Sequence, residues 1–327
     1  VSPIDKLVFY GLLVFLVELT IPMMYWIYCR RKITECRYSL RMEKDIFREM
    51  FGFAGWNFLT TCASMLSTQG VSILLNMQFG PVINASRGVA SQINGTVGAF
   101  HRNFTTALNP QITKTYAAED FEYVKRLVCK GAKFSYLAFF FIALPCMIEV
   151  NFFLSVWLKE VPAYAGIFVQ LTLLNSLVEV LLNSSETLNR ATGKIRNFQL
   201  LVSSAQFAIL IASYIALKIT ANPILVVSMA NIIYLLIFVP RILVNKPYVG
   251  MTFGYYYKEV LQGIIMMSVI SAALSLLPFM FMSDGWMRLV TVGVVSSISI
   301  IITSAIFVLT KGERDMVVRF VKNKLKR

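Results

Sequence analysis

The sequence has few of the residues that enzymes and metalloproteins commonly use for chemistry. It contains one histidine, and its five cysteines form no Cys-x-x-Cys pair. Protein zinc sites draw their ligands mostly from His and Cys, so this composition argues against a zinc or haem site. We therefore expect no metal and no cofactor.

Enzymatic motifs are missing as well. The Gly193-Lys194 pair has neither the upstream glycine nor the following hydroxyl residue of a phosphate-binding loop. The aspartates all stand alone, so there is no Asp-x-Asp pair for a metal-bound nucleotide sugar. The sequence also has no Gly-x-Ser-x-Gly and no His-Glu-x-x-His motif. These absences predict a protein that is not an enzyme.

Apolar residues are what the chain has in excess. They make up 57% of its 327 residues, and the mean hydropathy is +0.66. A helix that crosses a bilayer needs about 20 mostly apolar residues. Nine segments are predicted to span: 7–28, 53–78, 81–112, 134–154, 163–183, 198–217, 223–244, 260–282 and 286–309. The sequence thus predicts an all-α polytopic membrane protein with about nine transmembrane helices.

The distribution of positive charge predicts how these helices are oriented. The net charge is +14, and with nine spans 25 of the 31 Lys and Arg fall on one side and four on the other. Cytoplasmic loops concentrate positive charge, which explains the excess without a nucleic-acid partner. We predict a multi-pass plasma-membrane protein with its N-terminus outside and its C-terminus cytoplasmic. Residues 316–325 of the basic tail fit either an amphipathic helix on the inner leaflet or a solvated segment.

The third segment, 81–112, is unusually polar for a membrane span. It carries Arg87, His101 and Arg102, and ionisable groups inside a membrane are costly unless they face water or protein. At about 100° per residue, Ser91 and Asn94 fall on the same helical face as Arg87. We interpret this face as the lining of a polar path for an anionic, hydroxyl-rich solute. Pairing of an arginine with a carboxylate on another helix, or snorkelling of Arg102 to an interface, would also explain it.

A second polar stripe lies on the segment 53–78, where Asn57, Thr61, Ser64 and Thr68 recur at helical spacing. Such residues either line a cavity or mediate helix packing. The predicted cavity lining is Arg87, His101, Arg102, Asn94, Gln92, Asn57, Thr61 and Ser64. Glu18 and Glu179 lie in other spans, and each could pair with Arg87 or exchange a proton to couple transport.

Two stretches resemble a known family. NFLTTCASMLSTQGVSILLNMQFGP from Asn57, followed by NASRGVASQINGTVGAFHRNFTTALNPQITKTYAAED, resembles the central region of polysaccharide-transport-family flippases. These are the bacterial O-antigen and lipid-linked oligosaccharide translocases of the multidrug/oligosaccharidyl-lipid/polysaccharide superfamily, which has a MATE-like fold. The segment 186–194, ETLNRATGK, resembles that family's cytoplasmic turn.

The resemblance implies a division of the chain. Members of the family have about 14 spans, in two six-helix lobes and a terminal pair, so the nine spans here would be the last nine. The implied parts are the last helix of the N-terminal lobe with a basic cytoplasmic linker (1–51), the C-terminal six-helix lobe (52–246), the terminal helix pair (247–310) and the basic cytoplasmic tail (311–327). The chain would then lack the first five helices of the family.

The resemblance also implies a function. It is the flipping of an undecaprenyl-diphosphate-linked oligosaccharide across the bacterial inner membrane, for the O-antigen of lipopolysaccharide or another surface polysaccharide. Arg87 and Arg102 would then hold the diphosphate, and the amides would bind hydroxyls. The expected partners are this lipid-linked glycan, membrane lipids and the polysaccharide polymerase machinery. Two alternatives are a multidrug cation antiporter, which would need cavity carboxylates, and an O-antigen polymerase or ligase, which would need a large external loop.

Overall fold

The computed structural model describes residues 6–33 and 43–315. Residues 34–42 of the predicted basic linker and the predicted surface helix at 316–325 therefore lie outside the described residues. Helices make up 89% of the structure, and the described ranges contain no strand. The prediction of an all-α polytopic membrane protein is confirmed. The structure divides into two units, Val1–Phe51 and Gly52–Arg327.

The Val1–Phe51 unit contains α1 (Lys6–Lys32) and the first turns of α2 (Lys44–Phe79). From Val8 onward α1 is long and apolar enough to cross a membrane. It ends in Arg30, Arg31 and Lys32, where positive charge complements the partial negative charge of a helix C-terminus. The guanidinium of Arg30 also lies 5.1 Å from the centre of the Trp26 ring.

The Gly52–Arg327 unit contains the remainder of α2 and the helices that follow it. These are α3 (Pro81–Ala117), α4 (Phe121–Ile148), α5 (Val150–Trp157), α6 (Ala165–Ala191), α7 (Arg196–Ile219), α8 (Pro223–Leu236), α9 (Phe238–Leu243), α10 (Lys246–Val249), α11 (Phe253–Tyr256), α12 (Gln262–Phe281) and α13 (Trp286–Thr303). Two π-helical segments, η2 (Tyr257–Leu261) and η3 (Ser304–Val308), precede α12 and follow α13.

One predicted span, 81–112, is less apolar than the other long helices of the structure. Within the described residues, 8 helical segments are long and apolar enough to cross a membrane. The predicted span 81–112 falls outside this set, although α3, at 37 residues, is more than long enough. Its polar side chains keep it below the hydropathy of a membrane helix. It is therefore the helix that most needs protein or water around it.

Cross-helix hydrogen bonds give this unit two distinct ends. The Ser86 hydroxyl near the start of α3 donates to the carbonyl of Ala163, and the Thr187 hydroxyl near the end of α6 donates to Asn109. Hence α3 and α6 run in the same direction. One end, which we call the Gly80 end, holds the turn at Gly80, whose φ of +78° favours glycine. The other, the Asp120 end, holds the turn where the Asp120 carboxylate caps α4.

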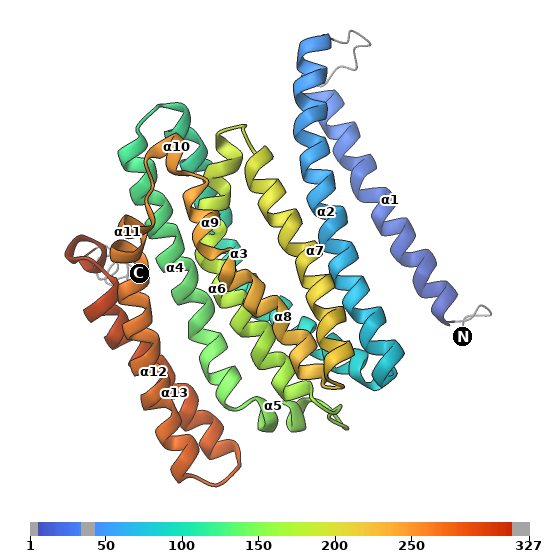
Figure 1. Ribbon diagram of the computed structural model, residues 1–327, viewed down its shortest axis with the longest axis vertical. Helices are drawn as coiled ribbons and strands as arrows, with labels where there is room; N and C mark the ends of the chain where they lie inside the picture. Colours follow the sequence, from blue (N-terminus) through green and yellow to red (C-terminus); the bar gives the residue numbers. More distant parts are fainter. Residues whose placement is uncertain (1–5, 34–42, 316–327) are drawn as a thin grey trace. The chain divides into compact units, whose positions relative to one another are not determined.

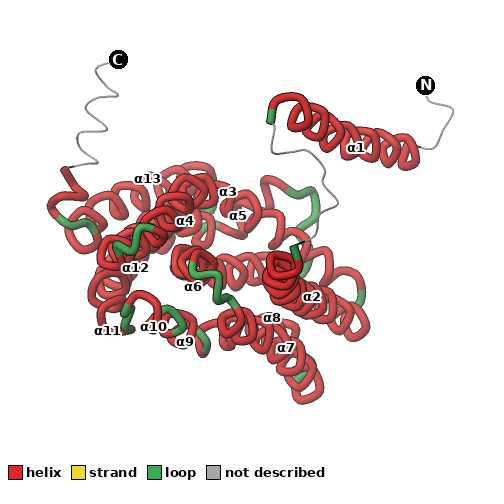
Figure 2. Tube along the Cα trace, turned by 90° about the horizontal axis from the view of Figure 1, so that it is seen from above, coloured by secondary structure: helices red, strands yellow, loops and turns green. Residues whose placement is uncertain are grey.

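α6 forms the centre of the packing. It contacts α3 and α4 on one side and α8 on the other (Figure 2). Phe168, Leu173, Leu182 and Leu188 of α6 are fully buried in the hydrophobic core. Beyond α4, α12 and α13 pack against each other and against α4 (Figure 1). This arrangement fixes one face of α3 against α6 over most of its length.

Three cations are buried in ion pairs within the helix bundle. The prediction of orientation counts them as charges in loops or at the start of a span. Arg288 of α13 pairs with Glu149 between α4 and α5. Arg241 of α9 is 2% exposed and pairs with Glu179 of α6, and Lys133 of α4 lies 3.5 Å from the Glu313 carboxylate. These three charges belong to helix packing and carry no information on orientation, which stays a prediction from the remaining loop charges.

Candidate functional site

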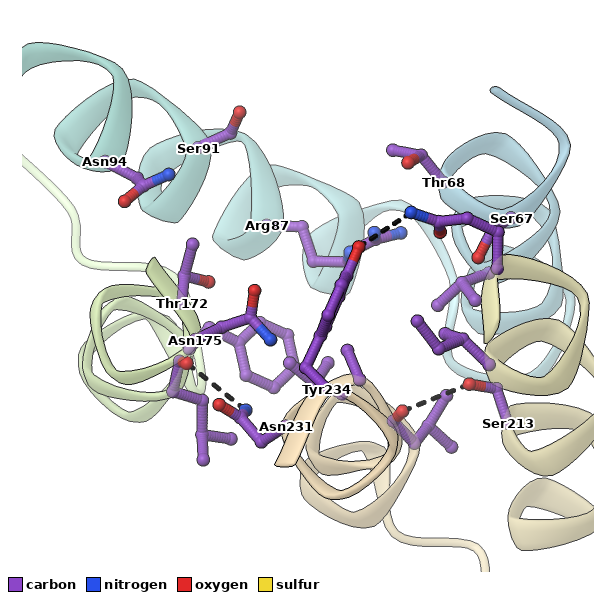
Figure 3. Close-up of a pocket in the computed structure, with 18 of the residues that line it drawn as sticks. Ser67, Thr68, Arg87, Ser91, Asn94, Thr172, Asn175, Ser213, Asn231 and Tyr234 are labelled. Atoms are coloured by element: carbon purple, nitrogen blue, oxygen red, sulfur yellow. Dashed lines mark hydrogen bonds between the residues drawn. The ribbon is translucent and has the colours of Figure 1, made fainter. Parts of the chain in front are cut away.

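A polar cavity of about 350 Å³ lies among α2, α3, α6, α7 and α8 (Figure 3). We call it the Arg87 cavity. Its polar lining is Ser64, Ser67 and Thr68 of α2, Arg87, Ser91 and Asn94 of α3, Thr172 and Asn175 of α6, Gln206 and Ser213 of α7, and Asn231 and Tyr234 of α8. Among the residues that the structure describes, no aspartate or glutamate lines it.

The sequence of α3 explains how one helix serves both the cavity and the core. Arg87, Ser91 and Asn94 are spaced four and three residues apart and so share one helical face. Ala90 and Ile93 lie on another face and are buried in the core. The cavity side chains are therefore held in place by apolar packing along the adjoining face of the same helix.

Arg87 is half-buried and enters the cavity without a carboxylate partner. Its guanidinium donates a hydrogen bond to the Ser72 hydroxyl of α2. Among the described residues, no Asp or Glu oxygen lies within 4.0 Å of it. Figure 3 shows Arg87 from α3 and Tyr234 from α8 projecting into the same space. The cavity therefore carries a positive charge that the described protein groups do not neutralise.

Amide groups around the cavity retain unused hydrogen-bonding capacity. Asn94 Oδ1, Asn175 Nδ2 and Asn231 Oδ1 are buried and have no partner among the described residues. A buried polar group without a partner costs about 1–3 kcal/mol. Other lining groups are satisfied: Gln206 donates to the Tyr234 hydroxyl at 2.6 Å, and Asn231 Nδ2 donates to the Leu171 carbonyl at 3.2 Å. The unpaired amides favour a polar occupant, either water or a ligand rich in hydroxyls.

The other two basic residues predicted for the path line a different cavity. His101 and Arg102 border a space of about 340 Å³ at the Asp120 end, together with Thr105 and Asn109 of α3 and Asn183, Glu186, Thr187 and Arg190 of α6. We call it the His101 cavity. The predicted single lining from Arg87 to Arg102 is thus divided between two separate cavities along the α3–α6 seam.

Three further predicted lining residues lie outside the Arg87 cavity, whereas Ser64 lines it. Asn57 accepts a hydrogen bond from Gln199 of α7 at 2.9 Å and so joins two helices. The exposed Thr61 hydroxyl donates to the Asn57 carbonyl one turn back along α2. Gln92 borders a third, largely apolar cavity of about 510 Å³ on the other side of α3. On α2, Asn57 therefore mediates helix packing, whereas Ser64 and Thr68 line a cavity.

Of the two predicted coupling carboxylates, Glu179 lies in the same unit as Arg87 but forms no ion pair with it among the described residues. Glu179 pairs with Arg241, which also lies 3.7 Å from Glu186. Arg241 comes from α9, and sequence spacing alone does not bring it to α6. Glu18 belongs to the Val1–Phe51 unit, where it is exposed on α1.

No family model, curated protein or solved structure matches this chain.

The chemistry of the site therefore rests on its own residues, several of which the sequence analysis missed. On α6, polar residues recur with helical spacing from one cavity to the other: Thr172, Asn175, Glu179, Asn183, Glu186 and Arg190. This periodicity in the sequence indicates that one face of α6 is polar, and it could have identified these residues. Asn231 and Tyr234 on α8 lie in a largely apolar helix and had no comparable pattern.

Proposed function

We propose that this chain is part of a transporter that flips a polyprenyl-diphosphate-linked oligosaccharide across the bacterial inner membrane. The observation that supports it best is Arg87, a cation without a carboxylate partner among the described residues, in a cavity lined by amides and hydroxyls. Guanidinium groups bind phosphate oxygens through charge-assisted hydrogen bonds, and amides suit sugar hydroxyls. The positive-inside pattern would place the Asp120 end at the cytoplasm.

The cavity volume limits what it would hold. At about 350 Å³ it is near the lower end of the range for small-molecule sites, about 300–1,000 Å³. It suits a diphosphate with an adjoining sugar ring rather than a whole oligosaccharide. The polyprenyl tail would stay among the membrane lipids, and the polysaccharide polymerase machinery would receive the flipped glycan.

The two alternative functions fit the site less well. A cation antiporter would need a carboxylate in the cavity, but none of the described lining residues is one, and Glu179 is already paired with Arg241. A polymerase or ligase would need a large loop at the Gly80 end. There the connections of the Gly52–Arg327 unit are limited to residue 80 and residues 158–164, 220–222 and 282–285.

The charge preference of the purified chain tests the proposal. Three probes share a farnesyl chain: a diphosphate-linked disaccharide, the same disaccharide joined through a neutral ether, and a trimethylammonium. Charge-assisted hydrogen bonds contribute about 1.5–3 kcal/mol, so the diphosphate should bind about tenfold or more tighter than the ether in equilibrium titrations. The ammonium should show no saturable binding. Tightest binding of the ammonium would contradict the proposal and favour the antiporter.

A further inference from the structure

The His101 cavity is lined by polar residues, and the proposed binding of a diphosphate by Arg87 gives it no role. Every described residue that lines it is polar or charged, and all of these residues come from α3 and α6. Arg102 is 15 residues from Arg87 on α3, which is about 22 Å at 1.5 Å per residue. That separation far exceeds a diphosphate group. One bound diphosphate therefore cannot occupy both cavities at once.

Positive charge exceeds negative charge around the His101 cavity. Glu186 is the only carboxylate among the described residues that line it, and it is held by Arg190 at 2.7 Å and by Arg241 at 3.7 Å. Arg102 has no carboxylate within 4.0 Å among the described residues, and its guanidinium donates to the Gly95 carbonyl of its own helix at 2.9 Å. Arg102 is thus available to bind an anion without breaking an ion pair.

A buried, unpartnered ring also borders this cavity. His101 is 7% exposed, and its Nδ1 has no hydrogen-bond partner among the described residues. One side of the imidazole packs edge-on against Phe139 of α4, with ring centres 5.6 Å apart. The hydroxyl of Thr105 and the amide of Asn109 line the same space. Together these groups offer a cation, an imidazole, a hydroxyl and an amide to one small ligand.

We propose that the His101 cavity binds a phosphate or diphosphate group, as a second anion site separate from the Arg87 cavity. Arg102 supplies the charge, and the side-chain NH2 of Asn109 donates hydrogen bonds to phosphate oxygens, whereas the Thr105 hydroxyl donates to carbonyls of its own helix. The phosphate comes either from solution or from a lipid headgroup. If the proposed function holds, this is where a lipid-linked diphosphate first docks at the Asp120 end; phosphate binding itself does not depend on that function.

The single histidine of the chain makes a site-specific test possible. The full chain carries a histidine-free affinity tag and [15N]histidine and is placed in phosphatidylcholine nanodiscs. Its one imidazole then reports on this cavity by NMR. Inorganic diphosphate should shift the signal saturably. Arg102→Gln should raise the dissociation constant about tenfold or more, because it removes a charge-assisted contact. Arg126→Gln is the matched control: Arg126 is exposed on α4, at the same end but outside the cavity, and its loss should change nothing.

Two further variants test the site without relying on Arg102→Gln alone. Asn109→Asp keeps the acceptor for the Thr187 hydroxyl but adds a negative charge, so it should also weaken diphosphate binding. Arg87→Gln should leave the histidine signal and its titration unchanged. A second set of nanodiscs, with phosphatidic acid and no added diphosphate, identifies the source. A shift there that diphosphate competes away assigns the site to a lipid headgroup, and no shift there assigns it to a soluble phosphate.

The contrary results are equally specific. Absence of a saturable shift, or equal titrations for Arg102→Gln and Arg126→Gln, would overturn the second site. Loss of the shift in Arg87→Gln alone would also overturn it, since the imidazole would then report the other cavity. Neither result bears on the farnesyl probes, whose charge preference tests the proposed function separately.

Discussion

Replacing Arg288 by methionine is expected to destabilise the chain by about 3 kcal/mol, because it leaves the Glu149 carboxylate buried without its partner. Arg288 donates to both carboxylate oxygens of Glu149, at 2.7 and 2.9 Å, and the Glu149 side chain is fully buried. Its guanidinium also lies 4.5 Å from the centre of the Phe279 ring. The expected loss is at the lower end of the range for buried pairs, since the neighbouring Asp284 is exposed and water is close.

A double variant separates the pair from general packing. Glu149→Gln combined with Arg288→Met removes both charges, so it should recover most of the stability lost in the single variant. The exposed pair of Glu122 with Lys125 is the matched control; Glu122→Gln should change stability by less than about 1 kcal/mol. Unfolding in a detergent titration, followed by circular dichroism, measures all four proteins. A loss in Arg288→Met no larger than in Glu122→Gln would mean that water reaches Glu149.

The Arg87→Ala variant is expected to lose most transport while reaching the membrane normally. Loss of a charge-assisted contact to the diphosphate should weaken substrate binding about tenfold to about a hundredfold. Insertion should not suffer, because removing a cation from a membrane span favours insertion, by up to about 2.5–3.5 kcal/mol at the centre of a helix. The readout is surface glycan in cells that depend on this transporter, normalised to the amount of protein in the membrane.

Two further variants show whether the position of the charge matters. Arg126→Ala removes an exposed arginine outside the cavities and should leave surface glycan unchanged. Arg87→Lys keeps a charge but loses the planar fork that matches phosphate oxygens, so it should retain partial transport. A normal amount of surface glycan in cells with Arg87→Ala would show that Arg87 is not needed for transport.

The sequence predicted the helices well because apolar length is a local property. All of the predicted spans except 81–112 correspond to apolar helices of the structure. Their ends were less well predicted. The segment that carries Lys125 and Lys133 was assigned to a loop, yet α4 begins at Phe121, because a helix continues beyond the membrane wherever a cap such as Asp120 starts it.

Which polar groups meet was harder to predict, because pairing depends on tertiary packing. The face shared by Arg87 and Asn94 follows from their spacing on one helix. Glu149 and Arg288 are 139 residues apart, and nothing in their local sequence indicates that they meet. The same limit applies to Glu179, whose partner Arg241 lies on a short helix after a break in the seventh predicted span. Single-helix periodicity shows which residues share a face, but not what that face contacts.

The central claim is that Arg87 borders a hydrated cavity rather than a packed interior. It is tested most directly by thiol accessibility at Ser91, which lines the cavity one turn from Arg87, in a chain whose native cysteines are replaced by serine. A thiol reacts as the thiolate, which forms only where water reaches. Ser91→Cys should therefore react with a water-soluble anionic methanethiosulfonate, and more slowly once Arg87→Gln removes the attracting charge. Ala90→Cys, at a buried position on the packed face of α3, should not react. If Ser91→Cys is as unreactive as Ala90→Cys, the cavity is dry and the account is contradicted.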